Sequence, residues 1–215
     1  MLLKRAEKKA DIIEIWVDAL KENVRPEEII ASVRKPLIIV NKSRKEKGGF
    51  RGSDGKRVKI LENYLRAGAG LIDASMDIKP ALLKKLCRVR AQNASRGKKS
   101  KIILSWHNFR KTPSLKILKK MRDRGFRHGA DIVKIATYAN GREDNLKILN
   151  LLADSSAKGK PVIAFCMGEY GRISRVLAPQ FGSYIIYVAL DPEHKTAPGQ
   201  LTVNEYKKIT SLLEL

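Results

Sequence analysis

The chain has 215 residues, of which 43% are hydrophobic, so it can bury one sizeable core and is not a disordered basic tail. Forty-four Lys and Arg against 22 Asp and Glu give a net charge of +22, which favours anionic partners. No apolar run approaches the roughly 20 residues that span a bilayer. The absence of a signal-peptide pattern and the two cysteines, which make no disulfide framework, predict a cytoplasmic protein. The two cysteines also lack metal-ligand spacing, and we expect no metal or other cofactor.

Seven short apolar runs, rich in β-branched residues, are predicted to be strands: 11–17, 36–40, 71–76, 101–106, 131–136, 161–166 and 184–189. Basic amphipathic segments between several of them are predicted to be helices. Strands that alternate with helices indicate a parallel sheet in a single α/β domain over residues 1–215. An open doubly wound sheet and a (β/α)8 barrel share this rhythm, and the length lies at the low end for a barrel.

Lys134 lies inside the apolar run "DIVKIA". A lysine is rarely buried without a partner or a purpose. In one interpretation it is a strand-end lysine whose stem reaches solvent. In the other it is a reactive amine, which burial among apolar neighbours keeps neutral, so that it can attack a ketone and form a Schiff base.

Two further residues have both a functional and an ordinary interpretation. His107 directly follows "IILSW", so a parallel strand would deliver it to the C-terminal rim where catalytic residues of α/β folds gather. It could equally be a histidine hydrogen-bonded in a turn. Arg175, in "GRISRVLAPQFGS" at the start of a predicted helix, suits a carboxylate or phosphate. In a chain this basic it could also be one more surface arginine.

The order of four segments, "SWHNFRKTP", "DIVKIAT", "MGEYGRISRVLAPQFGS" and "TAPGQ", resembles the type I 3-dehydroquinate dehydratases of the shikimate pathway. The resemblance runs from about residue 10 to the C-terminus. It implies a (β/α)8 barrel in place of an open sheet. It also implies that Lys134 condenses with the C3 ketone of 3-dehydroquinate and that His107 is the general acid and base.

The resemblance assigns roles to seven more residues. Glu46 would orient the histidine, and Arg175, Thr196 and Gln200 would hold the substrate carboxylate and ring oxygens. Glu14 would bind a hydroxyl, Tyr187 would form part of the pocket wall, and Lys42 stands where an arginine is usual. If the loop aligns differently, Ser43 or Arg44 takes that place and Lys47 replaces the glutamate.

The chain also departs from the family pattern. The family reads Glu-x-Arg where this chain reads "EIW", so that Trp16 replaces an arginine that helps to bind substrate. Only seven strands are predicted where a closed barrel has eight, because the first strand of the family has no counterpart. An upstream start, a homodimer or partner chain that covers the gap, and an open degenerate barrel all remain possible explanations.

An alternative hypothesis for the function is based on the net positive charge of the chain. A retired dehydratase could bind RNA or associate with ribosomes through two basic clusters that interleave Lys and Arg with Gly, Ser and Asn. Their cations are Lys42, Arg44, Lys45, Lys47, Arg51, Lys56, Arg57, Arg88, Arg90, Arg96, Lys98 and Lys99. A merely solvated basic surface is the third interpretation. We favour the enzyme, because the predicted lysine, histidine and carboxylate anchor are all present.

Overall fold

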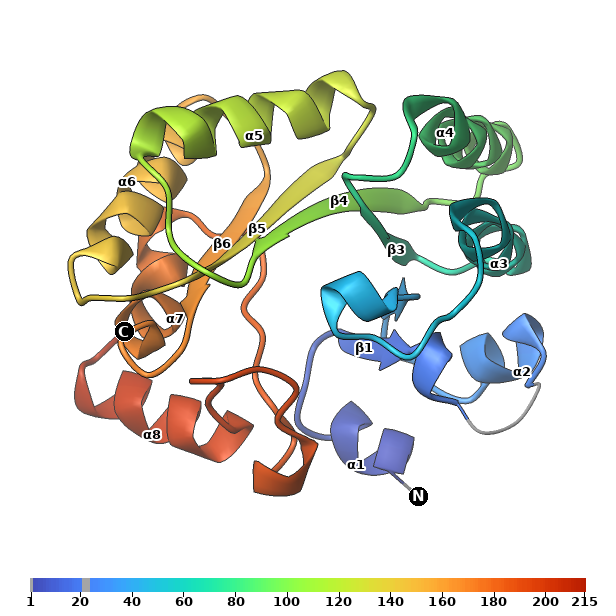
Figure 1. Ribbon diagram of the computed structural model, residues 1–215. Helices are drawn as coiled ribbons and strands as arrows, with labels where there is room; N and C mark the ends of the chain where they lie inside the picture. Colours follow the sequence, from blue (N-terminus) through green and yellow to red (C-terminus); the bar gives the residue numbers. More distant parts are fainter. Residues whose placement is uncertain (1, 21–23) are drawn as a thin grey trace. The chain divides into compact units, whose positions relative to one another are not determined.

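The structure is a computed structural model that describes residues 2–20 and 24–215. The chain forms two compact units, whose elements are coloured along the sequence in Figure 1. Unit 1 comprises the described residues up to Ser105 together with Gly125–Asp131, and unit 2 comprises Trp106–Arg124 and Ile132–Leu215. The prediction of a single domain stays a prediction.

Unit 1 is built on parallel strands in the order of the chain. They are β1 (Ile13–Trp16), β2 (Leu37–Val40), β3 (Leu71–Ser75) and the first part of β4 (Lys101–Asn108). Its helices are α1 (Leu2–Glu7), α2 (Pro26–Ala31), α3 (Asp54–Ala67) and α4 (Pro80–Ser95), with 3₁₀ turns at Val17–Ala19 and Arg44–Glu46. Every residue of β2 and β3 is buried, as expected for parallel strands covered on both faces.

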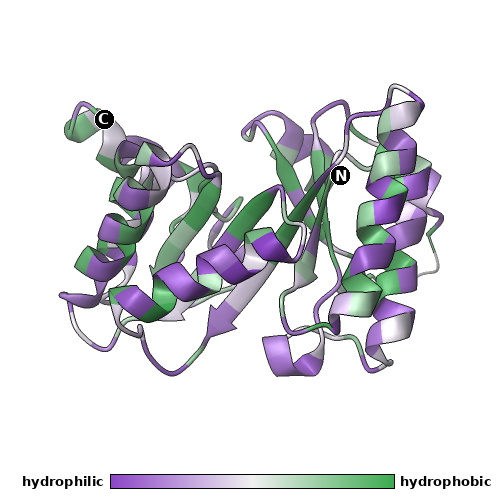
Figure 2. Cartoon of the chain, turned by 90° about the horizontal axis from the view of Figure 1, so that it is seen from above, coloured by the Kyte–Doolittle hydropathy of each residue, from purple (hydrophilic) through white to green (hydrophobic). Residues whose placement is uncertain are grey.

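Unit 2 contains the end of β4 and the parallel pair β5 (Ile132–Tyr138) and β6 (Val162–Met167). Its helices are α5 (Leu115–Arg127), α6 (Asp144–Ala157), α7 (Arg172–Leu177) and α8 (Val203–Leu212), with 3₁₀ turns at Ala178–Phe181 and Pro192–His194. In the register of the pair, Lys134 stands opposite Ile163. Figure 2 shows that the strands are mainly hydrophobic, whereas the helices alternate between hydrophobic and hydrophilic bands.

Six of the seven predicted strands are confirmed, and the seventh, 184–189, is wrong. This segment and the residue before it make only isolated contacts: Ser183 bridges Val162, the Tyr184 amide donates to the Val162 carbonyl at 2.8 Å, and Ala189 bridges Thr202. The residues have strand propensity, but a strand also needs a neighbour that pairs along its length. Here no ladder extends beyond the single bridges.

None of the helices in the described ranges has the combination of length and apolar character that would carry it across a membrane.

Candidate active site

Lys134 is buried in the middle of β5, where only 5% of its surface is exposed. Its neighbours in the strand, Val133 and Ile135, are fully buried. The lysine Nζ lies 3.9 Å from the centre of the Tyr187 ring, which places the amine against an aromatic face. The interpretation of Lys134 as a strand-end lysine that reaches solvent is therefore wrong.

Arg175 on α7 is also buried, with 6% of its surface exposed, and its guanidinium lies 4.4 Å from the centre of the Phe165 ring. Its Nε and Nη2 atoms find no hydrogen-bond partner among the residues that the structure describes. Burial lowers the pKa of the Arg175 guanidinium to about 10, so it stays charged at neutral pH. A buried, charged donor without an acceptor is suited to a planar anion such as a carboxylate.

Buried polar contacts hold the turn that carries Arg175. The Ser174 amide donates to the Asn145 side-chain oxygen at 3.0 Å, and the Cys166 amide of β6 donates to the Ser174 hydroxyl at 2.9 Å. The Asn145 side-chain amide donates in turn to the Tyr170 carbonyl at 2.8 Å. Because these groups are satisfied by one another, the start of α7 is fixed relative to β6 and α6.

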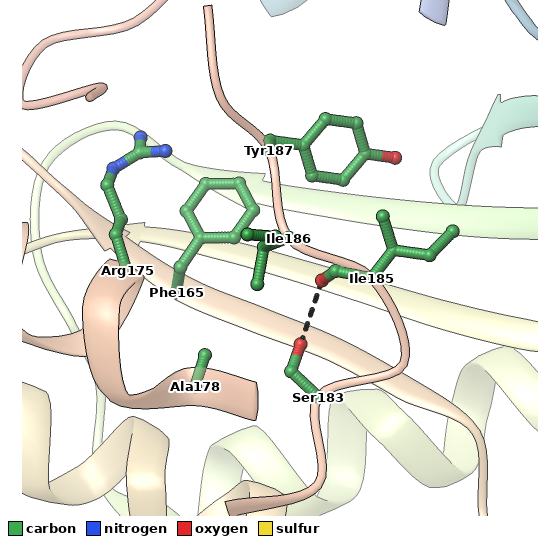
Figure 3. Close-up of a pocket in the computed structure, with 7 residues that line it drawn as sticks. All are labelled: Phe165, Arg175, Ala178, Ser183, Ile185, Ile186 and Tyr187. Atoms are coloured by element: carbon green, nitrogen blue, oxygen red, sulfur yellow. Dashed lines mark hydrogen bonds between the residues drawn. The ribbon is translucent and has the colours of Figure 1, made fainter. Parts of the chain in front are cut away.

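Two neighbouring aromatic rings lie between the Lys134 amine and the Arg175 guanidinium. Phe165 and Tyr187 have their ring centres 6.0 Å apart, so Lys134 contacts one ring of the pair and Arg175 contacts the other. In Figure 3 the Phe165 ring lies between Arg175 and Tyr187. Together with part of the segment after α7, these two rings line a small hollow, whose lining residues are Phe165, Arg175, Ala178, Ser183, Ile185, Ile186 and Tyr187.

The segment 196–200 brings together two predicted substrate ligands. The Thr196 amide and hydroxyl both donate to the Gln200 side-chain oxygen, at 2.8 and 3.2 Å. The Gly168 amide, just after β6, donates to the Pro198 carbonyl at 3.0 Å. Gly199 has φ +75°, and a Cβ there would lie 2.1 Å from the Gly168 carbonyl oxygen, so only glycine allows this close approach.

His107 lies near the end of β4, within unit 2, and is half-buried. Its imidazole stacks on the Phe109 ring, with 5.6 Å between the ring centres and 7° between the planes. The stacking restricts rotation of the imidazole, as a general acid and base requires. His107 and Lys134 thus belong to the same compact unit.

Lys42 lies two residues beyond the end of β2 in unit 1 and is buried, with 2% of its surface exposed. Its ammonium donates to Asp73 at 2.8 Å, to the Ser105 hydroxyl at 2.7 Å and to Glu46 at 3.4 Å. Ser105 also donates to Asp73, at 2.6 Å. An ammonium has three donors, and three protein acceptors surround this one, so Lys42 acts here as the centre of a buried ion cluster.

Glu46 is the outer member of that cluster. It accepts hydrogen bonds from Arg57 and from the Ser43 hydroxyl, the latter at 3.1 Å, in addition to Lys42. Burial opposes its charged form, but the nearby Lys42 and Arg57 outweigh that effect and lower the pKa of the Glu46 carboxyl. The carboxylate is therefore ionised at neutral pH. Its predicted role in orienting His107 stays a prediction.

Glu14 and Trp16, two residues apart on β1, point to the same side of the strand. The Trp16 indole donates to the Glu14 carboxylate at 2.9 Å, and both side chains are half-buried. The Trp16 indole thus supplies one donor to this glutamate.

Burial divides the cations predicted to contact nucleic acid. Lys42 and Arg57 are 2% and 3% exposed and already hold carboxylates, so the prediction that these two side chains contact nucleic acid is wrong. Arg90 is half-buried and pairs with Asp131 at 2.5 Å. The remaining nine are exposed: Arg44, Lys45, Lys47, Arg51, Lys56, Arg88, Arg96, Lys98 and Lys99.

Three residues of these clusters are not predicted from the sequence, namely Phe165, Asp73 and Ser105. Asp73 in "LIDASM" and Ser105 in "KIILSW" are polar residues inside apolar strands, which is the signal that singled out Lys134. Phe165 carries no comparable signal. Within the described ranges, no group of three or more His, Cys, Asp or Glu is placed to hold a metal ion.

Comparison with known proteins agrees with the fold and the sequence motifs. The family model described as type I 3-dehydroquinase matches residues 1–215. Relatives named 3-dehydroquinate dehydratase include one from Methanococcus maripaludis, 35% identical over 210 residues that cover 98% of this chain and 91% of the relative. Another, from Pyrococcus abyssi, is 36% identical over 209 residues, covering 95% and 88%.

Two solved structures are similar throughout. The type I 3-dehydroquinate dehydratase of Clostridium difficile has a TM-score of 0.84 and 27% identity, covering 99% of this chain and 86% of that one. The 3-dehydroquinate dehydratase of Aquifex aeolicus has a TM-score of 0.79 and 30% identity, covering 98% and 91%. These matches confirm the predicted barrel-type (β/α) fold class.

Proposed function

Because the chain belongs to the type I 3-dehydroquinase family, we propose that it is a lyase that dehydrates 3-dehydroquinate to 3-dehydroshikimate through a Schiff base on Lys134. One observation carries the proposal. The buried Lys134 amine and the buried Arg175 guanidinium, which lacks a hydrogen-bond partner among the described residues, contact the two rings of one aromatic pair.

The substrate is held by its carboxylate. Arg175 would donate its free Nε and Nη2 hydrogens to the two carboxylate oxygens, a geometry that only a planar guanidinium provides. The guanidinium is already desolvated in the free enzyme, so little reorganisation is needed when the anion arrives. Thr196 and Gln200 would bind the ring oxygens.

Lys134 supplies the nucleophile. Its neutral amine attacks C3 of the substrate ketone, and the resulting carbinolamine loses water to give an iminium. The positive nitrogen then withdraws electrons from the adjacent carbon–hydrogen bond. The face of the Tyr187 ring, 3.9 Å from Nζ, favours this positive charge through its quadrupole.

His107 moves the protons. The neutral imidazole removes a proton from the carbon beside the iminium, and an enamine forms. The electrons return as the C1 hydroxyl leaves, and the imidazolium gives the departing oxygen its proton, so that one molecule of water is lost. Hydrolysis of the iminium releases the product and restores the amine.

A turnover assay tests the proposal. The product has a conjugated double bond, so its ultraviolet absorbance reports dehydration continuously. Wild-type protein should turn over 3-dehydroquinate, and Lys134→Met, which keeps the length and apolar stem of the side chain, should not. Turnover by Lys134→Met at the wild-type rate would contradict the assignment of the nucleophile.

A retired enzyme is not favoured, because the matches reported above are named as dehydratases and cover nearly the whole chain. A homodimer that covers the predicted gap in the sheet stays a prediction. A cytoplasmic location is part of the proposal, supported by Cys87 and Cys166, which are both free thiols as a reducing compartment keeps them.

A further inference from the structure

Unit 1 carries a surface of cations that the dehydratase reaction does not use. The chain has no Asp or Glu between Asp77 and Asp123, and the whole of α4 lies inside this interval. Figure 1 shows α4 packed beside α3 at the outside of unit 1. We define the α4 surface as seven residues on this helix and its flanks: Lys79, Lys84, Lys85, Arg88, Arg96, Lys98 and Lys99.

All seven side chains are exposed, and none of them has an ion-pair partner within the described part of the chain. The acidic residues of the neighbouring elements are already engaged. Glu62 on α3 pairs with Arg66 at 2.8 Å and with Lys59 at 3.6 Å, and Asp131 pairs with Arg90 at 2.5 Å. The positive charge of the α4 surface is therefore not neutralised within unit 1.

The residues between these cations indicate which kind of anion fits. The exposed residues interspersed with them are small or polar, such as Ala81, Ala91, Gln92, Ser95 and Gly97. No exposed large hydrophobic or aromatic side chain of the described residues falls in 77–101. A protein interface needs an apolar core, and insertion into a lipid surface needs apolar anchors. The α4 surface has neither, and without aromatic rings it cannot stack on bases.

The dimensions fit a nucleic-acid backbone. A helix of 16 residues is about 24 Å long at 1.5 Å per residue. Each strand of a duplex carries one phosphate per about 3.4 Å of the axis, so a strand laid along α4 offers about seven phosphates, enough for every cation of the surface. The cations, and not the ligand, then set the number of contacts.

We propose that the α4 surface binds the phosphate backbone of RNA, independently of sequence. Cations on opposite sides of a helix cannot contact the same strand. We therefore expect about five of the seven cations to contact one strand at the same time. For single strands the logarithm of affinity should then fall with the logarithm of salt concentration with a slope of about −3.5. A monocarboxylate substrate needs one cation at its site, so this surface is a separate function of the fold.

Fluorescence anisotropy with a labelled oligouridine of about 20 nucleotides tests the proposal across a range of salt concentrations. The test variant replaces five cations of the surface by glutamine: Lys84→Gln, Lys85→Gln, Arg88→Gln, Lys98→Gln and Lys99→Gln. The control variant removes the same charge from exposed cations elsewhere: Lys8→Gln, Lys9→Gln, Arg142→Gln, Lys207→Gln and Lys208→Gln. Dehydratase turnover in both variants reports correct folding.

The α4 variant should lose at least about tenfold in affinity at low salt and most of the salt slope, whereas the control should keep both within about threefold. Equal losses in the two variants would show that net charge, and not this surface, attracts RNA, and would overturn the proposal. It is also overturned if wild-type protein binds no oligouridine at low salt, including the case in which it binds vesicles containing phosphatidylserine instead.

Discussion

Replacing Arg175 by methionine should make the protein more stable and a poor enzyme at the same time. The pKa of the guanidinium falls from 12.5 to about 10 on burial, and each pKa unit corresponds to about 1.36 kcal/mol. The folded state at pH 7 is therefore destabilised by about 3 kcal/mol. Since the folded pKa is the lower one, this destabilisation is complete below about pH 10 and disappears as the pH rises toward 12.5.

Part of the destabilisation is offset by the contact between Arg175 and Phe165, which contributes about 1 kcal/mol. Methionine keeps an apolar stem against the same ring, so Arg175→Met should gain about 2 kcal/mol in the free energy of unfolding. For a chain of this size the gain corresponds to a rise in Tm of about 4–8 °C.

The loss of function follows from the same contacts. Two hydrogen bonds to a charged carboxylate are together worth about 3–6 kcal/mol. The value of kcat/KM should therefore fall by about 10²–10⁴-fold. Urea unfolding and the absorbance assay measure the two effects on the same preparations.

Arg172→Met is the matched control, because Arg172 is an exposed residue of the same helix. It should change neither stability nor kcat/KM appreciably. If Arg175→Met is less stable than the wild type, its guanidinium is satisfied in the folded protein and the argument for an anion site at this position fails.

Three other substitutions test separate contacts. His107→Ala should lower kcat by about 10²–10⁴-fold, and borohydride should still trap some adduct in this variant; complete loss of trapping would make the histidine essential for imine formation itself. Trp16→Arg should lower KM if, as the resemblance implies, an arginine at this position binds substrate, and an unchanged or higher KM would show that this residue does not face the substrate. Lys42→Met should lower the free energy of unfolding by about 3–5 kcal/mol in urea, since it leaves the fully buried Asp73 without its cation. The exposed Lys45→Met should have no such effect, and equal stability of the two variants would argue against the buried ion cluster.

Strand positions could be predicted from the sequence where apolar β-branched runs coincide with a partner strand. The run 36–40 is β2, and all four strand residues are buried. The run 184–189 is also apolar and rich in β-branched residues but lacks a neighbour that pairs along its length. Local composition reports propensity, whereas pairing depends on what the rest of the chain places alongside. The side chains of 185–187 instead line the hollow beside Arg175.

The candidate site could be predicted only in part. Lys134 stands out because a charge inside an apolar run needs a reason, and the structure buries it. The surroundings of Lys42 could not be predicted, because Asp73 and Ser105 are 31 and 63 residues away along the chain. The sequence predicts Arg57 as a nucleic-acid contact, because nothing in its own segment indicates that it reaches Glu46.

Reductive trapping tests the central claim most directly. The protein is incubated with 3-dehydroquinate, treated with borohydride and digested, and its peptides are analysed by mass spectrometry. We predict one substrate-derived adduct on the peptide that contains Lys134, present in the wild type and absent from Lys134→Met. An adduct on a different lysine, or none while the wild type turns over substrate, would contradict the Schiff-base assignment.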